Sequence, residues 1–104
     1  MDTPPKAYED FVARFPGLGQ GWEQLRQGAR DAGPLDDKTL ALVKLGIALG
    51  SRRTGPVHSA TRKALKVGVS PVEIEQVVAH CATTLGMPSA VAGWTWIRDV
   101  LDGD

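Results

Sequence analysis

The chain has 104 residues, and its 12 basic and 12 acidic side chains give a formal net charge of zero. This length suits a single core, so residues 1–104 are expected to form one domain. The charge balance argues against a dedicated nucleic-acid-binding protein, which usually carries a basic excess.

The sequence predicts neither export nor membrane insertion. It opens with MDTPPKAYED, which has acids and prolines where a secretory signal needs a basic segment followed by an apolar one. No apolar run is long enough to span a bilayer. Cys81 is the single cysteine, so no intrachain disulfide can form, and this fits a reducing compartment. We therefore expect a cytoplasmic protein with neither a membrane nor a nucleic-acid partner.

Apolar periodicity predicts helices along the whole chain and no strands. We therefore expect an all-α bundle of five to six helices. The predicted helices span about 8–15, 21–32, 37–49, 56–67, 71–85 and 88–101.

Several helix ends carry clear sequence signals. Asp36 or Asp37 suits the N-cap of the third helix, and Gly50 suits its C-cap. Ser70 followed three residues later by Glu73 predicts a capping box at the start of the fifth helix. Between the third and fourth helices, SRRTG (51–55) is expected to form a basic loop.

The apolar stripes predict which sides of the helices face the core. The third helix is apolar nearly all round, which is typical of the middle of a bundle or of a subunit interface. The stripes expected in the later helices are Val57, Ala60, Ala64 and Val67; Ile74, Val77, Val78, Cys81 and Leu85; and Val91, Trp94, Ile97 and Leu101. Because Trp94 and Trp96 point about 200° apart, one of them is expected in the core and the other against a partner subunit.

Charge is distributed unevenly along the chain. Residues 38–72 contain seven Lys or Arg and no acid, whereas the segments before and after hold seven and five acids, respectively. An electropositive segment in the middle of the chain is the expected place for a small anionic partner or substrate.

The order of these signals resembles that of a known family. GPLDDKTLALVKLGIALG, GPVHSATRKALKVGVSPVEIEQVV and TTLGMPSAVAGWTWIRDVL are similar to segments of the carboxymuconolactone decarboxylase family, which includes AhpD-like alkylhydroperoxidases. The resemblance covers about residues 34–101, and residues 1–33 add N-terminal helices. It implies an all-helical fold and a homo-oligomer, a trimer or a hexamer.

The redox chemistry of the family does not carry over to this chain. The resemblance places its glutamate at about Ala41, its two cysteines at Arg53 and Pro56, and its histidine at Ala60, and all four positions are substituted. A dithiol peroxidase needs one thiolate to attack and a second thiol to resolve the mixed disulfide. Such activity is therefore not expected, and Cys81, one helix later, does not restore the motif.

The decarboxylase branch, which lacks the cysteines, resembles the chain more closely. It implies a lactone carboxylate held near a histidine and basic residues. His58 would act as general acid/base, Arg52 and Arg53 would bind the carboxylate, and Lys44 or His80 would assist. No cofactor is expected, because a cationic pocket would stabilise the enolate charge that develops in lactone decarboxylation. No metal is expected, because two histidines on different helices fall short of a ligand set.

One difficulty concerns the position of His58, two residues before the histidine expected from the family, at Ala60. A shift of two residues turns a helical side chain by about 200°. His58 therefore takes over that role only if the helix starts late and leaves it in a loop or in the first turn.

Each candidate also has a simpler interpretation. His58 and His80 can be surface histidines, Arg52 and Arg53 can be solvated or form ion pairs between subunits, and Lys44 can pair with an acid. Three functions therefore stay open: a decarboxylase-like enzyme for a small carboxylate or lactone, a non-catalytic oligomeric scaffold, and a peroxide-linked role through Cys81. Cys81 lies on an apolar stripe, which favours core packing over that last role.

Overall fold

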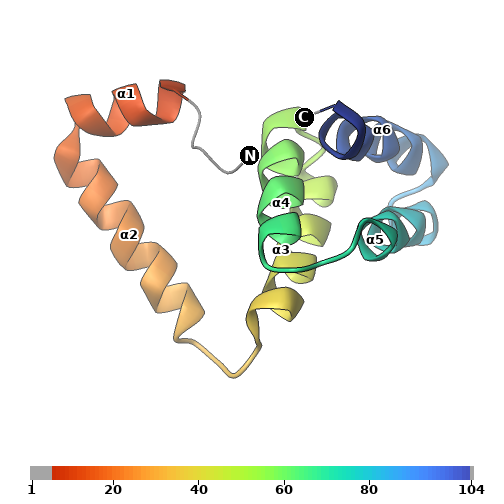
Figure 1. Ribbon diagram of the computed structural model, residues 1–104, viewed down its shortest axis with the longest axis horizontal. Helices are drawn as coiled ribbons and strands as arrows, with labels where there is room; N and C mark the ends of the chain where they lie inside the picture. Colours follow the sequence, from red (N-terminus) through yellow and green to blue (C-terminus); the bar gives the residue numbers. More distant parts are fainter. Residues whose placement is uncertain (1–5, 104) are drawn as a thin grey trace. The chain divides into compact units, whose positions relative to one another are not determined.

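The computed structural model describes residues 6–103, which fall into two compact units, 6–35 and 36–103. Within these residues there are six α-helices, one π-helical turn and no strand (Figure 1). The all-α prediction is confirmed. In the same residues no helix is both long enough and apolar enough to cross a membrane.

The N-terminal unit consists of α1 (Lys6–Arg14) and α2 (Pro16–Arg30). Only Phe15 separates them, so the expectation that α2 begins near residue 21 is wrong. Pro16 occupies the first position of α2, where a missing N–H costs no helical hydrogen bond. Gly19 lets the two helices approach, because a Cβ at this position would lie 3.1 Å from Val12 Cβ. None of the residues of the two helices is buried.

The C-terminal unit contains α3 (Asp37–Ser51), α4 (Thr54–Lys66), α5 (Pro71–Thr84), α6 (Met87–Arg98) and the π-helical turn η1 (Asp99–Gly103). α3 packs against α4 and α5, and α6 packs against α5 and α4 (Figure 1). Gly68 and Gly86 follow α4 and α5 with φ angles of 93° and 105°, a region that only glycine adopts without strain.

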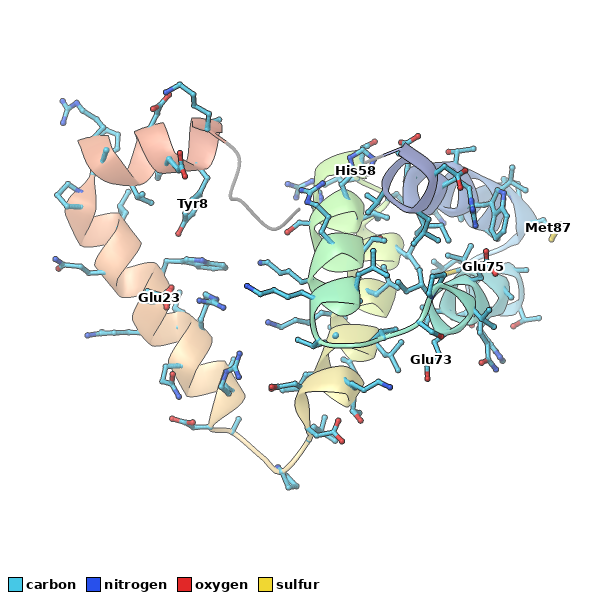
Figure 2. All side chains as sticks on the ribbon, in the orientation of Figure 1. Tyr8, Glu23, His58, Glu73, Glu75 and Met87 are labelled. Atoms are coloured by element: carbon cyan, nitrogen blue, oxygen red, sulfur yellow. The ribbon has the colours of Figure 1, made fainter. Side chains whose placement is uncertain are left out.

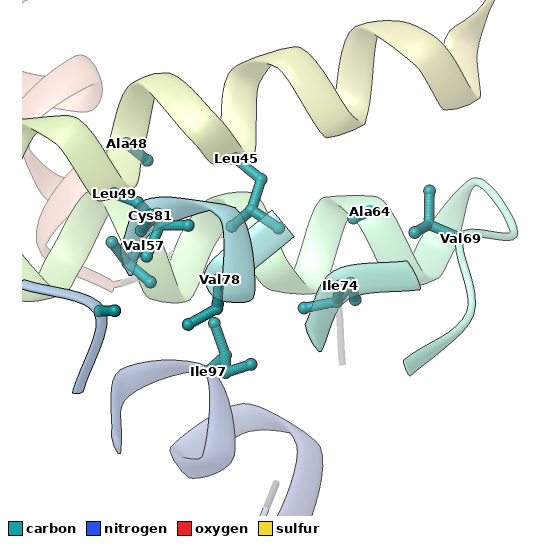
Figure 3. Close-up of a cluster of buried hydrophobic side chains, with 11 residues drawn as sticks. Leu45, Ala48, Leu49, Val57, Ala64, Val69, Ile74, Val78, Cys81 and Ile97 are labelled. Atoms are coloured by element: carbon teal, nitrogen blue, oxygen red, sulfur yellow. The ribbon is translucent and has the colours of Figure 1, made fainter. Parts of the chain in front are cut away.

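The core of this unit is built mainly from aliphatic side chains of all four helices (Figure 3). Its buried members are Leu45, Ala48, Leu49, Val57, Ala64, Val69, Ile74, Val78, Cys81, Ala90 and Ile97. The predicted stripe of α5 is confirmed, since Val77 and Leu85 pack against this cluster.

The predicted stripes of α4 and α6 are wrong in part, because Val67, Val91 and Trp94 are exposed. On α6 the buried side is instead Ala90, Gly93 and Ile97, whose first two members are small and allow a close helix approach. Trp96 packs against the core, as expected for one of the two tryptophans.

The ends of α3 confirm one prediction and correct another. Asp36 is the N-cap, and its Oδ1 accepts a hydrogen bond of 2.8 Å from the Thr39 backbone N–H. The helix does not end at Gly50 but continues to Ser51, and Arg52 takes the left-handed conformation with φ 59°. Within its unit α3 buries one side only, and Ile47 on the other side is 68% exposed.

The capping box of α5 is confirmed. Ser70 Oγ accepts from the Glu73 backbone N–H at 3.1 Å, and Glu73 Oε1 accepts from the Ser70 N–H at 2.8 Å. Lys38 Nζ at the start of α3 lies 3.8 Å from the same Oε1 atom. The hydrogen bond from Ser70, followed by the charge of Lys38, lowers the pKa of Glu73.

Glu73→Gln is expected to make the stability of the protein less dependent on acid. Because the pKa of Glu73 is lowered from its ordinary 4.5, the carboxylate stabilises the fold above that pH, and this contribution is lost as the pH falls through the lowered value. Glutamine keeps the capping geometry but does not titrate. Urea unfolding at about pH 7 and about pH 3 should show a smaller loss of stability in the variant than in the wild type.

Glu9→Gln is the matched control for this experiment. Glu9 is an exposed glutamate of α1 that has no ion pair within residues 6–103. Glu9→Gln should lose as much unfolding free energy between the two pH values as the wild type does. Equal acid sensitivity of Glu73→Gln and the wild type would contradict the expected role of the Glu73 charge.

Candidate functional site

The turn between α3 and α4 is shorter than the sequence suggests, which decides the position of His58. Only Arg52 and Arg53 separate the two helices, because α4 begins at Thr54 and not at Pro56. His58 therefore lies in the second turn of α4, not in a loop or the first turn. It does not take the place of the family histidine expected at Ala60.

His58 forms a polar contact with a residue that the sequence did not single out. Its Nε2 atom lies 2.9 Å from Asp99 Oδ2, between the beginning of α4 and the turn η1, which packs against α4. Figure 2 shows His58 on α4, beside the end of the last helix. The His58 side chain is 28% exposed and the Asp99 side chain 55%. The two residues are 41 positions apart, so no local spacing could have predicted their contact.

Arg52 and Arg53 lie at the same end of the α3–α4 pair as His58. Arg52 closes α3, and Arg53 is the N-cap of α4. The backbone of Arg53 is five residues before His58, about 7.5 Å along the helix axis. Both arginines are exposed, and neither makes an ion pair within the described part of the chain. Their guanidinium groups are therefore available to a dissolved anion.

Lys44 and His80 lie elsewhere. Lys44 is exposed on α3, about 10 Å along the helix from Ser51. His80 is exposed on the outer side of α5. Among residues 6–103, neither forms a hydrogen bond or an ion pair with His58. Their predicted assistance to His58 gains no support from these positions and stays a prediction.

A shallow, open depression lies on the surface of α2, in the N-terminal unit. It is lined by Gly21, Gln24, Leu25, Gly28 and Ala29. None of the predicted site residues belongs to it, so it is not the pocket that a common site for them would need. Within the described residues, no group of three His, Cys, Asp or Glu side chains is arranged to hold a metal ion.

A second polar cluster holds the turn that carries Asp99. Arg98 Nη1 lies 2.5 Å from Glu75 Oε2 on α5, and Arg98 Nε lies 3.1 Å from Asp102 Oδ2. The hydrogen bond from Arg98 lowers the pKa of Asp102, and the same contact raises the pKa of Arg98. The Arg98 guanidinium also lies over the Trp94 ring, 5.2 Å from its centroid.

The comparison with family models matches residues 16–99 to the carboxymuconolactone decarboxylase family. The chain belongs to this family. The match starts at the first residue of α2 and so includes a helix that the resemblance over residues 34–101 leaves out. No curated protein and no solved structure matches the chain.

Cys81 is buried on α5, away from the positions that the resemblance assigns to the redox cysteines of the carboxymuconolactone decarboxylase family. It is 6% exposed, and its Sγ lies 3.6 Å from the Val77 carbonyl oxygen. Burial raises the pKa of the thiol and so disfavours the reactive thiolate. These properties agree with core packing and oppose a redox role.

We expect Cys81 to react slowly with a chromogenic aromatic disulfide. Attack requires a thiolate and a local opening of the core, so the native protein should react at least about 100-fold more slowly than protein unfolded in guanidinium chloride. The matched control is Ala79→Cys in a Cys81→Ala background, which puts the only thiol at an exposed position of the same helix. If native Cys81 reacted as fast as this control, its assignment to the core would be wrong.

Proposed function

We propose that this member of the carboxymuconolactone decarboxylase family acts on a small carboxylate or lactone by acid/base chemistry that needs no cofactor. The observation that carries the proposal is the contact of 2.9 Å between His58 Nε2 and Asp99 Oδ2. A histidine paired with a carboxylate can take up and return a proton near neutral pH. His58 is the residue to which we assign this proton transfer.

The proposed reaction requires one proton and no external electrons. The C–C bond to the departing carboxylate breaks, CO2 leaves, and the bonding electron pair moves into the conjugated lactone carbonyl as an enolate. Protonated His58 then gives a proton to the enolate carbon, and a proton from water restores the imidazolium. Positive charge next to the enolate lowers the barrier, because the negative charge develops during the reaction.

Arg52 and Arg53 are proposed to provide this positive charge and to bind a carboxylate of the substrate. A guanidinium group binds a carboxylate through two parallel hydrogen bonds, which fixes the orientation of the ligand. The arginines support this role by their exposure and by their place just before the first turn of α4, the helix that carries His58.

We also propose that the protein works as a homo-oligomer, a trimer or hexamer, in the cytoplasm. Exposed apolar residues on α3 and α6 support subunit contacts. They are Val43, Ile47, Met87, Val91 and Trp94. A buried, unpaired Cys81 is consistent with a reducing compartment.

A non-catalytic binding or scaffold protein is the second candidate. It is favoured by the substitution of the four redox positions. Such a protein would still bind a carboxylate through Arg52 and Arg53 but would release no CO2. Binding and turnover therefore have to be measured separately.

Binding of carboxymuconolactone and its neutral dimethyl ester, in which both carboxylates are masked, should be compared by thermal shift and calorimetry. We expect the carboxylate to raise the melting temperature, since a ligand that prefers the native state stabilises it. The variant Arg52→Gln/Arg53→Gln should bind at least about 10-fold more weakly, whereas Arg62→Gln, farther along α4, should bind normally. CO2 release then separates an enzyme from a scaffold.

Two results would contradict the proposed site. If the ester bound as well as the acid, the arginines would not recognise a carboxylate. If Arg62→Gln weakened binding as much as the double variant, the effect would come from general surface charge.

A further inference from the structure

We propose that Asp99 is a positioning residue for His58. Its carboxylate decides which of the two imidazole nitrogens is free to exchange protons. The tautomer assigned to His58 follows from its contact with Asp99, whereas the role of Asp99 in turnover rests on the proposed function. Asp99 lies outside the electropositive middle of the chain and at the last residue matched by the family model.

The argument begins with the hydrogen-bonding capacity of a carboxylate. An ionised carboxylate only accepts hydrogen bonds, so the contact of 2.9 Å requires a proton on His58 Nε2. In a neutral imidazole the other nitrogen, Nδ1, then carries the lone pair. Nδ1 is therefore the atom that accepts a proton from bound water or substrate and returns it.

Protonation of His58 does not break this arrangement. When Nδ1 takes up a proton, Nε2 keeps its own, and the hydrogen bond to Asp99 becomes an ion pair. The hydrogen bond of 2.9 Å to Asp99 keeps the ring from rotating. Asp99 would thus orient the ring of His58, as a carboxylate orients the histidine of a serine protease.

The position of Asp99 is set by the turn η1. Val100, the next residue, is buried in the C-terminal unit, and the preceding residue, Arg98, is bonded to Glu75 on α5. Arg98 also holds Asp102 at the far side of the turn. The backbone on both sides of Asp99 is thus held in place. The contact between its carboxylate and His58 therefore costs little conformational entropy.

Nuclear magnetic resonance of the two histidine rings tests the proposal without any substrate. The chain contains only His58 and His80, so a long-range proton–nitrogen spectrum of 15N-labelled protein has two ring patterns, assigned with His80→Gln. At about pH 8.5, where histidine is neutral, we expect His58 to show one tautomer with Nε2 protonated. Exposed His80 should show the averaged pattern of two exchanging tautomers.

Variants of the aspartates provide the comparison. Asp99→Ala should convert the His58 pattern to an average like that of His80, and the Nε2–H proton signal should be lost to exchange with water. Asp99→Asn should no longer hold the single Nε2-protonated tautomer, because its amide can donate to Nε2 as well as accept from it. Asp102→Asn is the matched control, because it removes an acid of the same turn that contacts Arg98 and not His58. It should lower the melting temperature but leave the His58 pattern unchanged.

Three results would overturn the proposal. They are an averaged His58 pattern in the wild type, an unchanged pattern in both Asp99 variants, or an equal change in Asp102→Asn. The last result would mean that the His58 pattern depends on the stability of the turn η1 and not on the contact with Asp99.

Turnover of carboxymuconolactone distinguishes this proposal from the proposed function. If His58 showed a single tautomer but the protein released no CO2, Asp99 would still position the ring, and the proposed enzymatic function would be wrong. If Asp99→Asn released CO2 at a rate within about 2-fold of the wild type, the protein would be an enzyme, and the positioning role of Asp99 would be wrong. If both hold, Asp99→Asn should lower kcat at least about 10-fold with little change in KM.

Discussion

Gly93→Val is expected to be among the most destabilising single substitutions in this chain. A Cβ atom at position 93 would lie 2.7 Å from Leu49 Cδ2 and 4.0 Å from Val78 Cγ1. Leu49 and Val78 are each 3% exposed, so neither side chain can swing into solvent. Overpacking of a closed core costs about 1–3 kcal/mol and occasionally more, and valine adds two further methyl groups. Urea unfolding should therefore show a loss of about 3 kcal/mol.

Gly46→Ala is the control for this substitution. Gly46 is a helix-interior glycine of α3, and a Cβ there would meet no atom within 4 Å. Alanine should stabilise the protein by about 0.5–1 kcal/mol, because it restricts the unfolded chain and favours a helix. If Gly93→Val unfolded at the same urea concentration as the wild type, the close contact between α6 and Leu49 would not exist in solution.

A double variant locates the source of the strain. Leu49→Ala alone should cost about 2–5 kcal/mol, since it leaves a cavity in the core. Combined with Gly93→Val, the loss should be smaller than the sum of the two, because the valine fills part of the space that Leu49 vacates. Strict additivity would contradict the contact.

The same contact shows why the sequence predicted α6 only in part. The helix itself was predictable from periodicity and from the proline in its first turn. Its buried side was not, because Ala90 and Gly93 do not stand out as apolar residues, whereas exposed Val91 and Trp94 do. The distance between helices is set by small residues, and a pattern based on large apolar residues does not detect them.

Local signals predicted the caps of α3 and α5, because those contacts join residues three positions apart. Asp36 and Ser70 both accept hydrogen bonds from the backbone N–H three residues later. The turn between α3 and α4 was less predictable, because Arg52 adopts a positive φ that sequence rules assign to glycine. Pro56 in the first turn of α4 is tolerated since N–H groups there have no partner within the helix.

The sequence singled out only some residues of the candidate site, because it shows local signals and not contacts made by tertiary packing. His58, Arg52 and Arg53 stood out because they lie in an electropositive segment that matches the chemical part of a known family. Asp99 carried no signal of its own, since an aspartate near the end of a helix is common. Its contact with His58 depends on the packing of η1 against α4, which no local pattern encodes.

His58→Gln is expected to reduce CO2 release from carboxymuconolactone by about 10²–10⁴-fold. This range is the usual contribution of a positioned acid or base to catalysis. Glutamine can still form a hydrogen bond to Asp99 but cannot exchange a proton at neutral pH, so the variant separates packing from proton transfer. Mass spectrometry of the product and a coupled assay for CO2 both measure the loss.

His80→Gln is the control, since it removes the other histidine from an exposed position of α5. It should leave CO2 release unchanged. Binding of carboxymuconolactone to His58→Gln should persist, because the proposed carboxylate contacts come from Arg52 and Arg53. If His58→Gln released CO2 at the rate of the wild type, the proton would have to come from another group. The contact between His58 and Asp99 would then serve only to join α4 to the end of the chain.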